Sequence, residues 1–151
     1  MVPTSAPPET GHETTPDVVH QLAQFRFRLR RFLRFSERSA RSAGVTPLQH
    51  QLMLGIAGFT GPGWATVSDL AEFLQDRHNA VVALVNRAER DGLVLKRKHR
   101  ADRRVVRVHL TARGRRILAA LSSLHQDELT RFLGDTSHLL APWPTRSRPQ
   151  L

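Results

Sequence analysis

Six basic side chains fall within nine consecutive residues, namely Lys96, Arg97, Lys98, Arg100, Arg103 and Arg104. Such groups bind phosphate oxygens, and arginine also enters narrow minor grooves of DNA. Structure alone gives little reason to crowd like charges in this way, so the segment predicts contact with a polyanion. The candidate contacts to duplex DNA are Lys98, Arg100, Arg103 and Arg104. Asp102 lies among them, and we expect it to pair with Arg104 and fix a turn.

A second set of side chains lies earlier in the chain, at or near the face that a helix leaves exposed when it buries Val81, Leu84, Val85 and Ala88. These candidates for contact with base edges are Arg77, His78, Asn79, Val82 and Asn86. Asparagine can pair bidentately with adenine, histidine and arginine can donate to guanine, and valine can meet a thymine methyl. The alternative for each of them is an ordinary solvated helix position.

The basic residues at 96–104 lie between two runs that the sequence predicts to form a β-hairpin. Residues 94–99 and 105–110 have the composition of strands, and the second run alternates between apolar and polar side chains. The glycine-containing residues 58–64 predict a loop that joins a helix to a strand. Gly92 marks the end of the helix before the hairpin, because glycine is favoured just past a helix C-terminus.

Capping residues mark the starts of the supporting helices. Thr46, followed by proline and then Gln49, predicts a helix from 47 to about 57. Thr66 starts a third helix, a fourth begins near His78, and Thr111 caps a long fifth helix that we expect to end at Gly134. A short sixth turn is predicted at 138–140.

Apolar residues at three- and four-residue spacing define one face on each of the two long helices. In the first helix, expected to end near 42–44, they are Leu22, Phe25, Leu29, Phe32 and Leu33, and in the fifth they are Ile117, Leu118, Leu121, Leu124, Leu129, Phe132 and Leu133. These faces either pack within the chain or form an interface between chains. The order of elements predicts a mainly α fold with a small β-wing, a winged helix-turn-helix between two long helices.

Composition narrows the class of protein. Twenty-three basic residues against 13 acidic ones give a formal charge of +10, and only Lys96 and Lys98 among the basic residues are lysines. This excess suits a polyanionic partner, although charge alone equally fits an arginine-rich proteome or a merely soluble surface. The absence of cysteine excludes disulfides, thiolate zinc sites and thiol redox switches, and fits a cytoplasmic protein. No signal peptide and no membrane-spanning apolar run is expected.

The spacing of several short motifs resembles the MarR family of transcriptional regulators. The motifs are Leu70-Ala71-Glu72, Leu84-Val85-Asn86-Arg87-Ala88-Glu89-Arg90 and Gly92-Leu93-Val94, followed by Asp102-Arg103-Arg104, Leu110-Thr111 and Gly114. Together they span residues 66–114, with no gap between the helix-turn-helix motifs. The chain departs from the family in the turn Gln75-Asp76-Arg77, where a glycine followed by an apolar residue is frequent, and at Ala88, where leucine is common.

The resemblance implies a homodimeric repressor in which the first and last helices of two chains interlock on a pseudopalindromic operator. It assigns Leu22, Phe25, Leu29, Leu121, Leu129 and Phe132 to the dimer interface. It also implies a pocket for a small lipophilic or phenolic effector, for which the candidates are Phe32, Phe35, His50, Met53 and Leu54; the alternative for these five is the core.

The expected division of the chain is a disordered tail at 1–16, one MarR-like domain at 17–140, and a tail at 141–151. Within the domain, 45–110 forms the winged lobe, and 17–44 and 111–140 form the dimerisation helices.

Other classes of function fit the sequence less well. It has no glycine-rich phosphate loop, no Gly-x-Ser-x-Gly and no His-Glu-x-x-His, so we expect neither an enzyme nor a cofactor. The eight histidines show no paired ligand spacing, which disfavours a metal site within one chain. The remaining alternative is a module of the same fold that binds DNA without specificity or docks on another protein, since phosphate contacts by themselves carry no sequence information.

Overall fold

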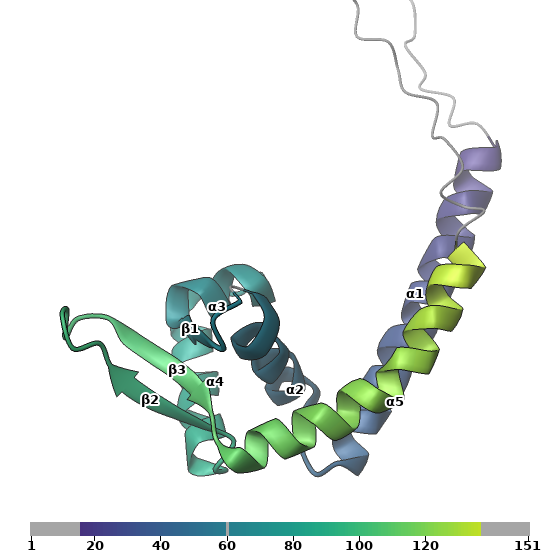
Figure 1. The fold of residues 1–151 in the computed structure, drawn as a ribbon. Coiled ribbons are helices and arrows are strands. Elements are labelled where there is room, and N and C mark those ends of the chain that lie inside the picture. Colours follow the sequence, from purple (N-terminus) through teal and green to yellow (C-terminus); the bar gives the residue numbers. More distant parts are fainter. Residues whose placement is uncertain (1–15, 60, 137–151) are drawn as a thin grey trace, which may run out of the picture.

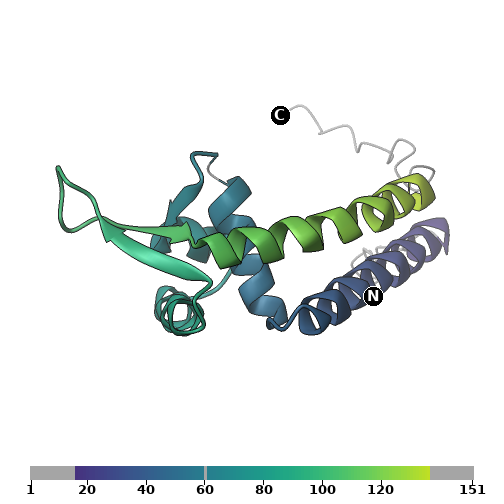
Figure 2. The ribbon, with the colours of Figure 1, turned by 60° about the horizontal axis from the view of Figure 1, so that its bottom comes forward.

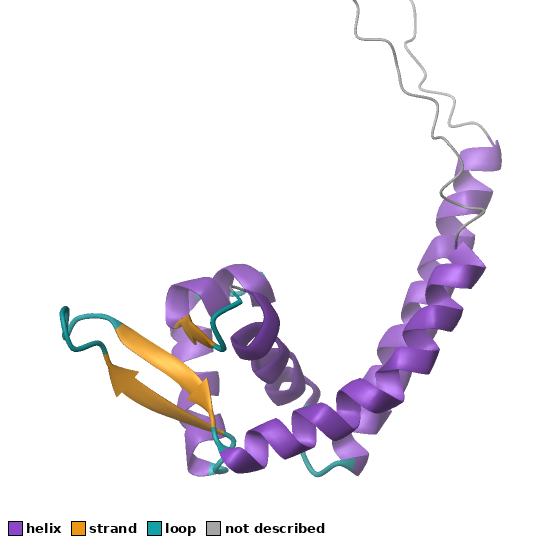
Figure 3. Cartoon of the chain, viewed as in Figure 1, coloured by secondary structure: helices purple, strands orange, loops and turns teal. Residues whose placement is uncertain are grey.

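The computed structural model describes residues 16–59 and 61–136, and within them it is mostly helical with one small sheet (Figures 1 and 3). The elements are α1 (Pro16–Ser42), α2 (Pro47–Leu54), the π-helical segment η1 (Gly55–Phe59), β1 (Trp64–Thr66), α3 (Val67–Leu74), α4 (His78–Arg90), β2 (Val94–Lys98), β3 (Val106–Leu110) and α5 (Ala112–Thr136). This confirms the predicted fold class. Residues 1–15, the turn predicted at 138–140 and the segment 141–151 lie outside the described residues.

Capping boxes start the two short helices where the sequence places them. Thr46 accepts the main-chain N–H of Gln49 at 3.1 Å, and the Gln49 side chain accepts the N–H of Thr46 at 2.9 Å. Thr66 and Asp69 exchange the equivalent pair of bonds at the start of α3. Each box satisfies two main-chain amides that a helix start leaves without partners.

Two predicted helix ends differ from the structure. The helix expected to reach about residue 57 ends as α2 at Leu54 and continues as η1. A Cβ on Gly55 would lie 2.8 Å from Phe73 Cδ1, so the absent side chain lets α3 pack closely here. At the other end of the chain, α5 passes through Gly134 and ends at Thr136. Gly134 lacks the positive φ with which Gly44 and Gly92 follow α1 and α4.

The three strands form an antiparallel sheet in the order β1-β3-β2, with Trp64 opposite His109 and Val94 opposite Leu110. The strands β2 and β3 therefore lie where they were predicted, and each is one residue shorter than predicted at the outer end of the hairpin. One face of the sheet packs on the helices through Ala65 and Val108, which are fully buried. The opposite face carries Trp64, Arg107 and His109.

One core joins α2, η1, α3, α4, the sheet and the first part of α5. Its fully or almost fully buried members include Leu52, Met53, Ile56, Leu70, Val81, Val85, Leu93, Val94, Val108 and Leu121. The helices α1 and α5 lie side by side and extend away from this lobe, on the side opposite the hairpin (Figures 1 and 2). Among the described helices none is long and apolar enough to cross a bilayer.

Candidate nucleic-acid interface

The helix α4 presents two different faces. Val81, Leu84, Val85 and Ala88 are buried in the core. The residues that the sequence proposes for base contacts, His78, Asn79, Val82 and Asn86, are exposed on the other side, and Arg77 is exposed at the N-cap position. The apolar spacing thus orients the helix so that its polar face is available to a partner.

The turn before α4 keeps a left-handed residue without using glycine. Gln75 ends α3 at φ 52° and ψ 41°, a conformation that costs a non-glycine residue free energy. Its side-chain amide donates to the carbonyl of Glu72 at 2.7 Å, and the Asp76 carboxylate accepts the N–H of Arg77 at 2.7 Å. The departure from the family in Gln75-Asp76-Arg77 therefore still leaves a tight turn between α3 and α4.

Lys96 connects the exposed face of α4 to the base of the hairpin. Its ammonium group donates to Asn86 Oδ1 at 2.8 Å and pairs with the Glu89 carboxylate at 3.0 Å, while its main-chain N–H donates to Glu89 at 3.1 Å. The side-chain carbonyl of Asn86 is thus already hydrogen-bonded to Lys96 within the chain. Sequence reasoning missed this link, since the partners lie seven and ten residues apart on different elements.

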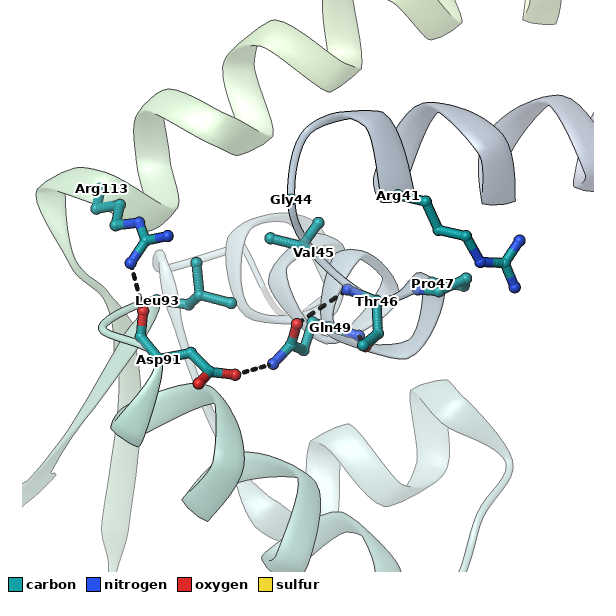
Figure 4. A pocket seen from close by; sticks show the side chains of 9 residues that line it. All are labelled: Arg41, Gly44, Val45, Thr46, Pro47, Gln49, Asp91, Leu93 and Arg113. Carbon is teal, nitrogen blue, oxygen red and sulfur yellow. Dashed lines mark hydrogen bonds between the residues drawn. The ribbon is translucent and has the colours of Figure 1, made fainter.

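The C-terminal end of α4 is held by contacts from α2 and α5 (Figure 4). Gln49 Nε2 donates to Asp91 Oδ2 at 2.6 Å, and the Arg113 guanidinium donates to the carbonyl of Asp91 at 2.8 Å. Both contacts border an open hollow of about 470 Å³. They fix α4 at the end remote from its N-terminal polar residues, and nothing in the local sequence pattern indicated them.

Gly114 sets the position of α5 against the hairpin. A Cβ at this residue would lie 2.1 Å from the carbonyl oxygen of Leu93. The Thr111 hydroxyl donates to the carbonyl of Gly92 at 2.6 Å and accepts the N–H of Gly114 at 3.0 Å, so the cap of α5 also ties the helix to the end of α4. The Leu-Thr and glycine of the family pattern therefore join the lobe to the long helix.

The hairpin tip carries the proposed DNA contacts. Lys98, Arg100, Arg103 and Arg104 are all exposed, and none of them has an ion pair within the described part of the chain. The strands close through a hydrogen bond from the N–H of His99 to the carbonyl of Val105 at 2.9 Å. The basic side chains thus remain available on a short projecting ribbon.

Asp102 accepts the main-chain N–H of Arg104 at 2.9 Å, and its own carbonyl accepts the N–H of Val105. The expected pairing with Arg104 thus uses the backbone of that residue and not its guanidinium group. His99 Nδ1 accepts the N–H groups of Ala101 and Asp102, each at 3.3 Å. The turn is consequently organised by hydrogen bonds that main-chain N–H groups donate, mostly to the side chains of His99 and Asp102, and these bonds do not use the arginine side chains.

An aromatic and a cationic side chain pack on the outer face of the sheet. The Arg107 guanidinium carbon lies 3.8 Å from the Trp64 ring centroid, which joins β3 to β1. Burial, followed by the charges of Arg97 and Arg107, lowers the pKa of His109 below its usual value. The low pKa favours a neutral His109 on this face.

A cavity of about 420 Å³ lies where α2 meets α1 and α5. Three of the proposed pocket residues, Phe32, His50 and Leu54, line it together with Ser36, Ser122, His125, Gln126 and Leu129. The other two do not: Met53 is fully buried in the core, and Phe35 lines a different hollow. Phe35 still contacts the lining residue His125, with ring centroids 5.3 Å apart. Met53 faces the core because it is adjacent to Leu54 in the sequence, and neighbouring helical positions face in different directions.

Two histidines meet at this cavity, with ring centroids 5.0 Å apart. Burial, and secondarily the neighbouring His125, lowers the pKa of His50. His125 Nδ1 lies 2.6 Å from the carbonyl of Leu121, and its Nε2 is buried without a hydrogen-bond partner. In the described ranges, no group of three or more histidines and carboxylates is arranged to hold a metal ion.

The residues assigned to a dimer interface occupy three kinds of environment. Leu22 and Leu129 are exposed, and Leu29 is partly buried. Phe25 and Phe132 pack against each other with ring centroids 6.4 Å apart. Leu121 is fully buried in the core of its own chain, so it has no surface to offer a second chain. The sequence pattern did not separate these environments because core and interface positions share one helical period.

Comparison with known proteins gives the same fold. Residues 43–105 match the MarR family. The solved structure of AbsC, a MarR family transcriptional regulator from Streptomyces coelicolor, aligns with a TM-score of 0.69 and 21% identity over 85% of this chain and 84% of that chain. The MarR family transcription regulator SP03579 aligns with a TM-score of 0.67 and 28% identity over 83% of each chain.

A DNA complex is also among the similar structures. A mutant of MepR from S. aureus bound to an oligodeoxyribonucleotide aligns with a TM-score of 0.61 and 22% identity over 75% of this chain and 80% of that chain. No curated protein matches the sequence. Residues 43–105 are thus similar to the MarR family, and the described chain has the fold of MarR family transcriptional regulators.

Proposed function

We propose that this protein is a sequence-specific regulator of transcription that binds duplex DNA as a homodimer and represses from a pseudopalindromic operator. The observation that carries the proposal is the exposed polar face of α4 beside a projecting basic hairpin, the two being joined by Lys96. A helix with such a face fits the major groove, and the arginines of the hairpin fit the neighbouring minor groove. The DNA complex of MepR supports this reading of the fold.

The two parts of the interface have different tasks in this proposal. His78 and Asn79 lie in the first turn of α4, the part of a recognition helix that contacts base edges. Arg103 and Arg104 at the hairpin tip contact the backbone or the minor groove. Asn86 contributes its amide N–H groups first, because its carbonyl would have to leave Lys96 before it could accept a bond from a base.

Exposed apolar side chains on the long helices support the dimer. Leu22 and Leu33 on α1 and Leu124, Leu129 and Leu133 on α5 are each more than two-fifths exposed. Because each of these side chains is already about half buried, covering it with a second chain would contribute about 0.7–1.5 kcal/mol, half of the value for a fully exposed side chain. A two-fold arrangement then presents two copies of α4 to two half-sites.

The cavity beside His50 suits the proposed effector. Its lining is mainly apolar and contains neither lysine nor arginine, which favours a small lipophilic or phenolic molecule. A ligand there touches α1, α2 and α5 together, so it can favour one placement of the lobe over another. Phenol is a simple probe: it should raise the unfolding midpoint of the wild-type protein but not that of Ser122→Trp, whose added ring fills the cavity.

Selection of bound duplexes from a random library at near-physiological salt tests the proposed function. A specific regulator yields an inverted repeat with half-sites about one helical turn apart, and binds it at least about a thousandfold more tightly than scrambled DNA. Comparable affinity for all duplexes would contradict the proposal and favour a module that binds DNA without specificity.

A further inference from the structure

The positive charge of the chain is concentrated on α1 and not on the winged lobe. Residues 26–41 hold seven arginines and one acidic residue, a net charge of +6 out of the formal +10. Residues 43–111 hold ten basic and six acidic residues, a net charge of +4. The function proposed above uses the lobe's charge alone and leaves the larger part of the excess without a role.

Five of the α1 arginines form a continuous exposed band, which we call the α1 stripe: Arg26, Arg30, Arg34, Arg38 and Arg41. Steps of three and four residues bring successive side chains together on a helix surface. At 1.5 Å of rise per residue, the band is about 22 Å long. It is therefore an extended cationic surface and not an isolated pair of charges.

The stripe has almost no internal compensation. Arg41 lies 3.7 Å from the Glu37 carboxylate, and both side chains of this pair are about half exposed or more. The other four arginines have no ion pair within residues 16–59 and 61–136. Like charges at this spacing destabilise a helix, so the stripe is poorly explained by the stability of α1.

The chemistry of the stripe favours the phosphate backbone of DNA. Every cation in it is a guanidinium group, whose fork matches phosphate oxygens. A duplex presents a phosphate about every 3.4 Å of axis on each strand, so several lie within the length of the band. A membrane fits less well because Phe25 and Phe32 already pack against Phe132, and the function proposed above covers the exposed Leu22 and Leu33 with a second chain.

The position of the stripe separates it from the lobe's own DNA. α1 extends to the side of the molecule opposite the hairpin (Figures 1 and 2). A straight duplex lying along α4 and the hairpin would not follow α1. We infer that the α1 stripe binds a second DNA segment, so that one protein molecule bridges two duplexes. Binding of the first duplex by α4 and the hairpin rests on the proposed function, whereas binding of the second duplex does not.

A capture experiment tests the bridge with the full chain. An immobilised duplex carrying the selected operator is saturated with protein, and binding of a second labelled duplex without that operator is measured at low salt. The wild type should retain the second duplex, and Arg30→Gln with Arg34→Gln should lower its retention at least about tenfold. The matched variant Arg116→Gln with Arg131→Gln removes two charges from α5 and should retain it, and Glu37→Gln should increase retention.

The inference would be overturned if the wild type did not retain the second duplex, or if the stripe variant retained it equally well. It would also be overturned if polyglutamate displaced the second duplex as effectively as unlabelled duplex does. Conversion of the stripe variant to a monomer would instead assign the stripe to the dimer interface. Equal unfolding midpoints show that these exchanges leave the fold intact. If the random library yields no operator, the same capture is done with two duplexes of unrelated sequence, one immobilised and one labelled. The α1 stripe is then tested even where the proposed function fails.

Discussion

The winged lobe and the pair of long helices differ in how far each covers its own apolar surface. In the lobe, Leu52, Ile56, Leu70 and Val108 are fully buried. On the long helices, seven large apolar side chains are 44–59% exposed: Val19, Leu22, Phe27 and Leu33 on α1, and Leu124, Leu129 and Leu133 on α5. Among the described large apolar side chains of the lobe, Leu48, Leu54, Phe59 and Val82 are 36–48% exposed. The lobe thus covers its apolar surface more fully than the long helices, which leave surface that a second chain can cover.

Polar groups show the same contrast. In the lobe, Lys96 binds both Asn86 and Glu89, and Gln49 binds Asp91, so charged and amide groups fix one element to another. On α1, four of the five stripe arginines have no such partner within the described residues. Lys98, Arg100, Arg103 and Arg104 at the hairpin tip also lack an ion pair among the described residues. The paired groups therefore fix the elements of the lobe to one another, whereas the hairpin tip and the α1 stripe keep cationic groups available to a partner.

The largest effect is expected at Gly114, where the lobe joins α5. Gly114→Ala places a methyl group 2.1 Å from the Leu93 carbonyl oxygen, a main-chain atom that cannot move alone. We expect a loss of about 3 kcal/mol in the free energy of unfolding, measured by urea denaturation. Gly134→Ala is the matched control, since its Cβ would meet nothing within 4 Å; a similar loss there would show that the effect is not local to the junction.

Next in size is the effect of charging the exposed face of α5. Leu129→Glu with Leu133→Glu should raise the dissociation constant of the dimer at least about a hundredfold, because apolar surface is replaced by buried carboxylates in both chains. Analytical ultracentrifugation measures this change. Leu48→Glu alters an exposed leucine of the lobe and should leave the dimer intact. An unchanged dimer in the α5 variant would place the interface elsewhere.

A smaller effect is expected at the turn before α4. Gln75→Gly should stabilise the lobe by about 0.5–1 kcal/mol, because glycine adopts the left-handed conformation without strain. Gln75→Ala keeps the strain and loses the hydrogen bond to Glu72, so it should destabilise the lobe. Thermal unfolding distinguishes the two variants, and a destabilised glycine variant would mean that the side-chain bond outweighs the strain.

The smallest effect is the pH dependence of stability contributed by His50, between the lobe and the long helices. Its pKa is lowered in the folded chain by burial and by His125. Well above pH 6.5 the His50 imidazole is neutral in both the folded and the unfolded chain. As the pH falls below 6.5, His50 of the unfolded chain is protonated first, so the free energy of unfolding decreases until the pH reaches the pKa of His50 in the folded chain. The urea midpoint of His50→Gln should therefore fall less than that of the wild type between pH 8 and pH 5.5. The control His20→Gln, which changes an exposed histidine, should show the same fall as the wild type.

The sequence was sufficient for features that depend on local pattern. The caps at Thr46 and Thr66, the orientation of α4 through Val81, Leu84 and Val85, and the hairpin all follow from residue spacing. It was insufficient where distant elements meet, as for Lys96 with Asn86 and Gln49 with Asp91. It also could not separate buried Leu121 from exposed Leu129, because both lie on the apolar face of one helix.

The most direct test of the central claim compares the recognition helix with the hairpin on DNA. Affinities of wild type, Asn79→Ala and Arg104→Ala are measured for the selected operator and for scrambled DNA at one salt concentration. We predict that Asn79→Ala lowers the ratio of the two affinities about tenfold or more, whereas Arg104→Ala weakens binding to both duplexes alike. An equal loss on both duplexes for Asn79→Ala would contradict the assignment of α4 as the element that reads sequence.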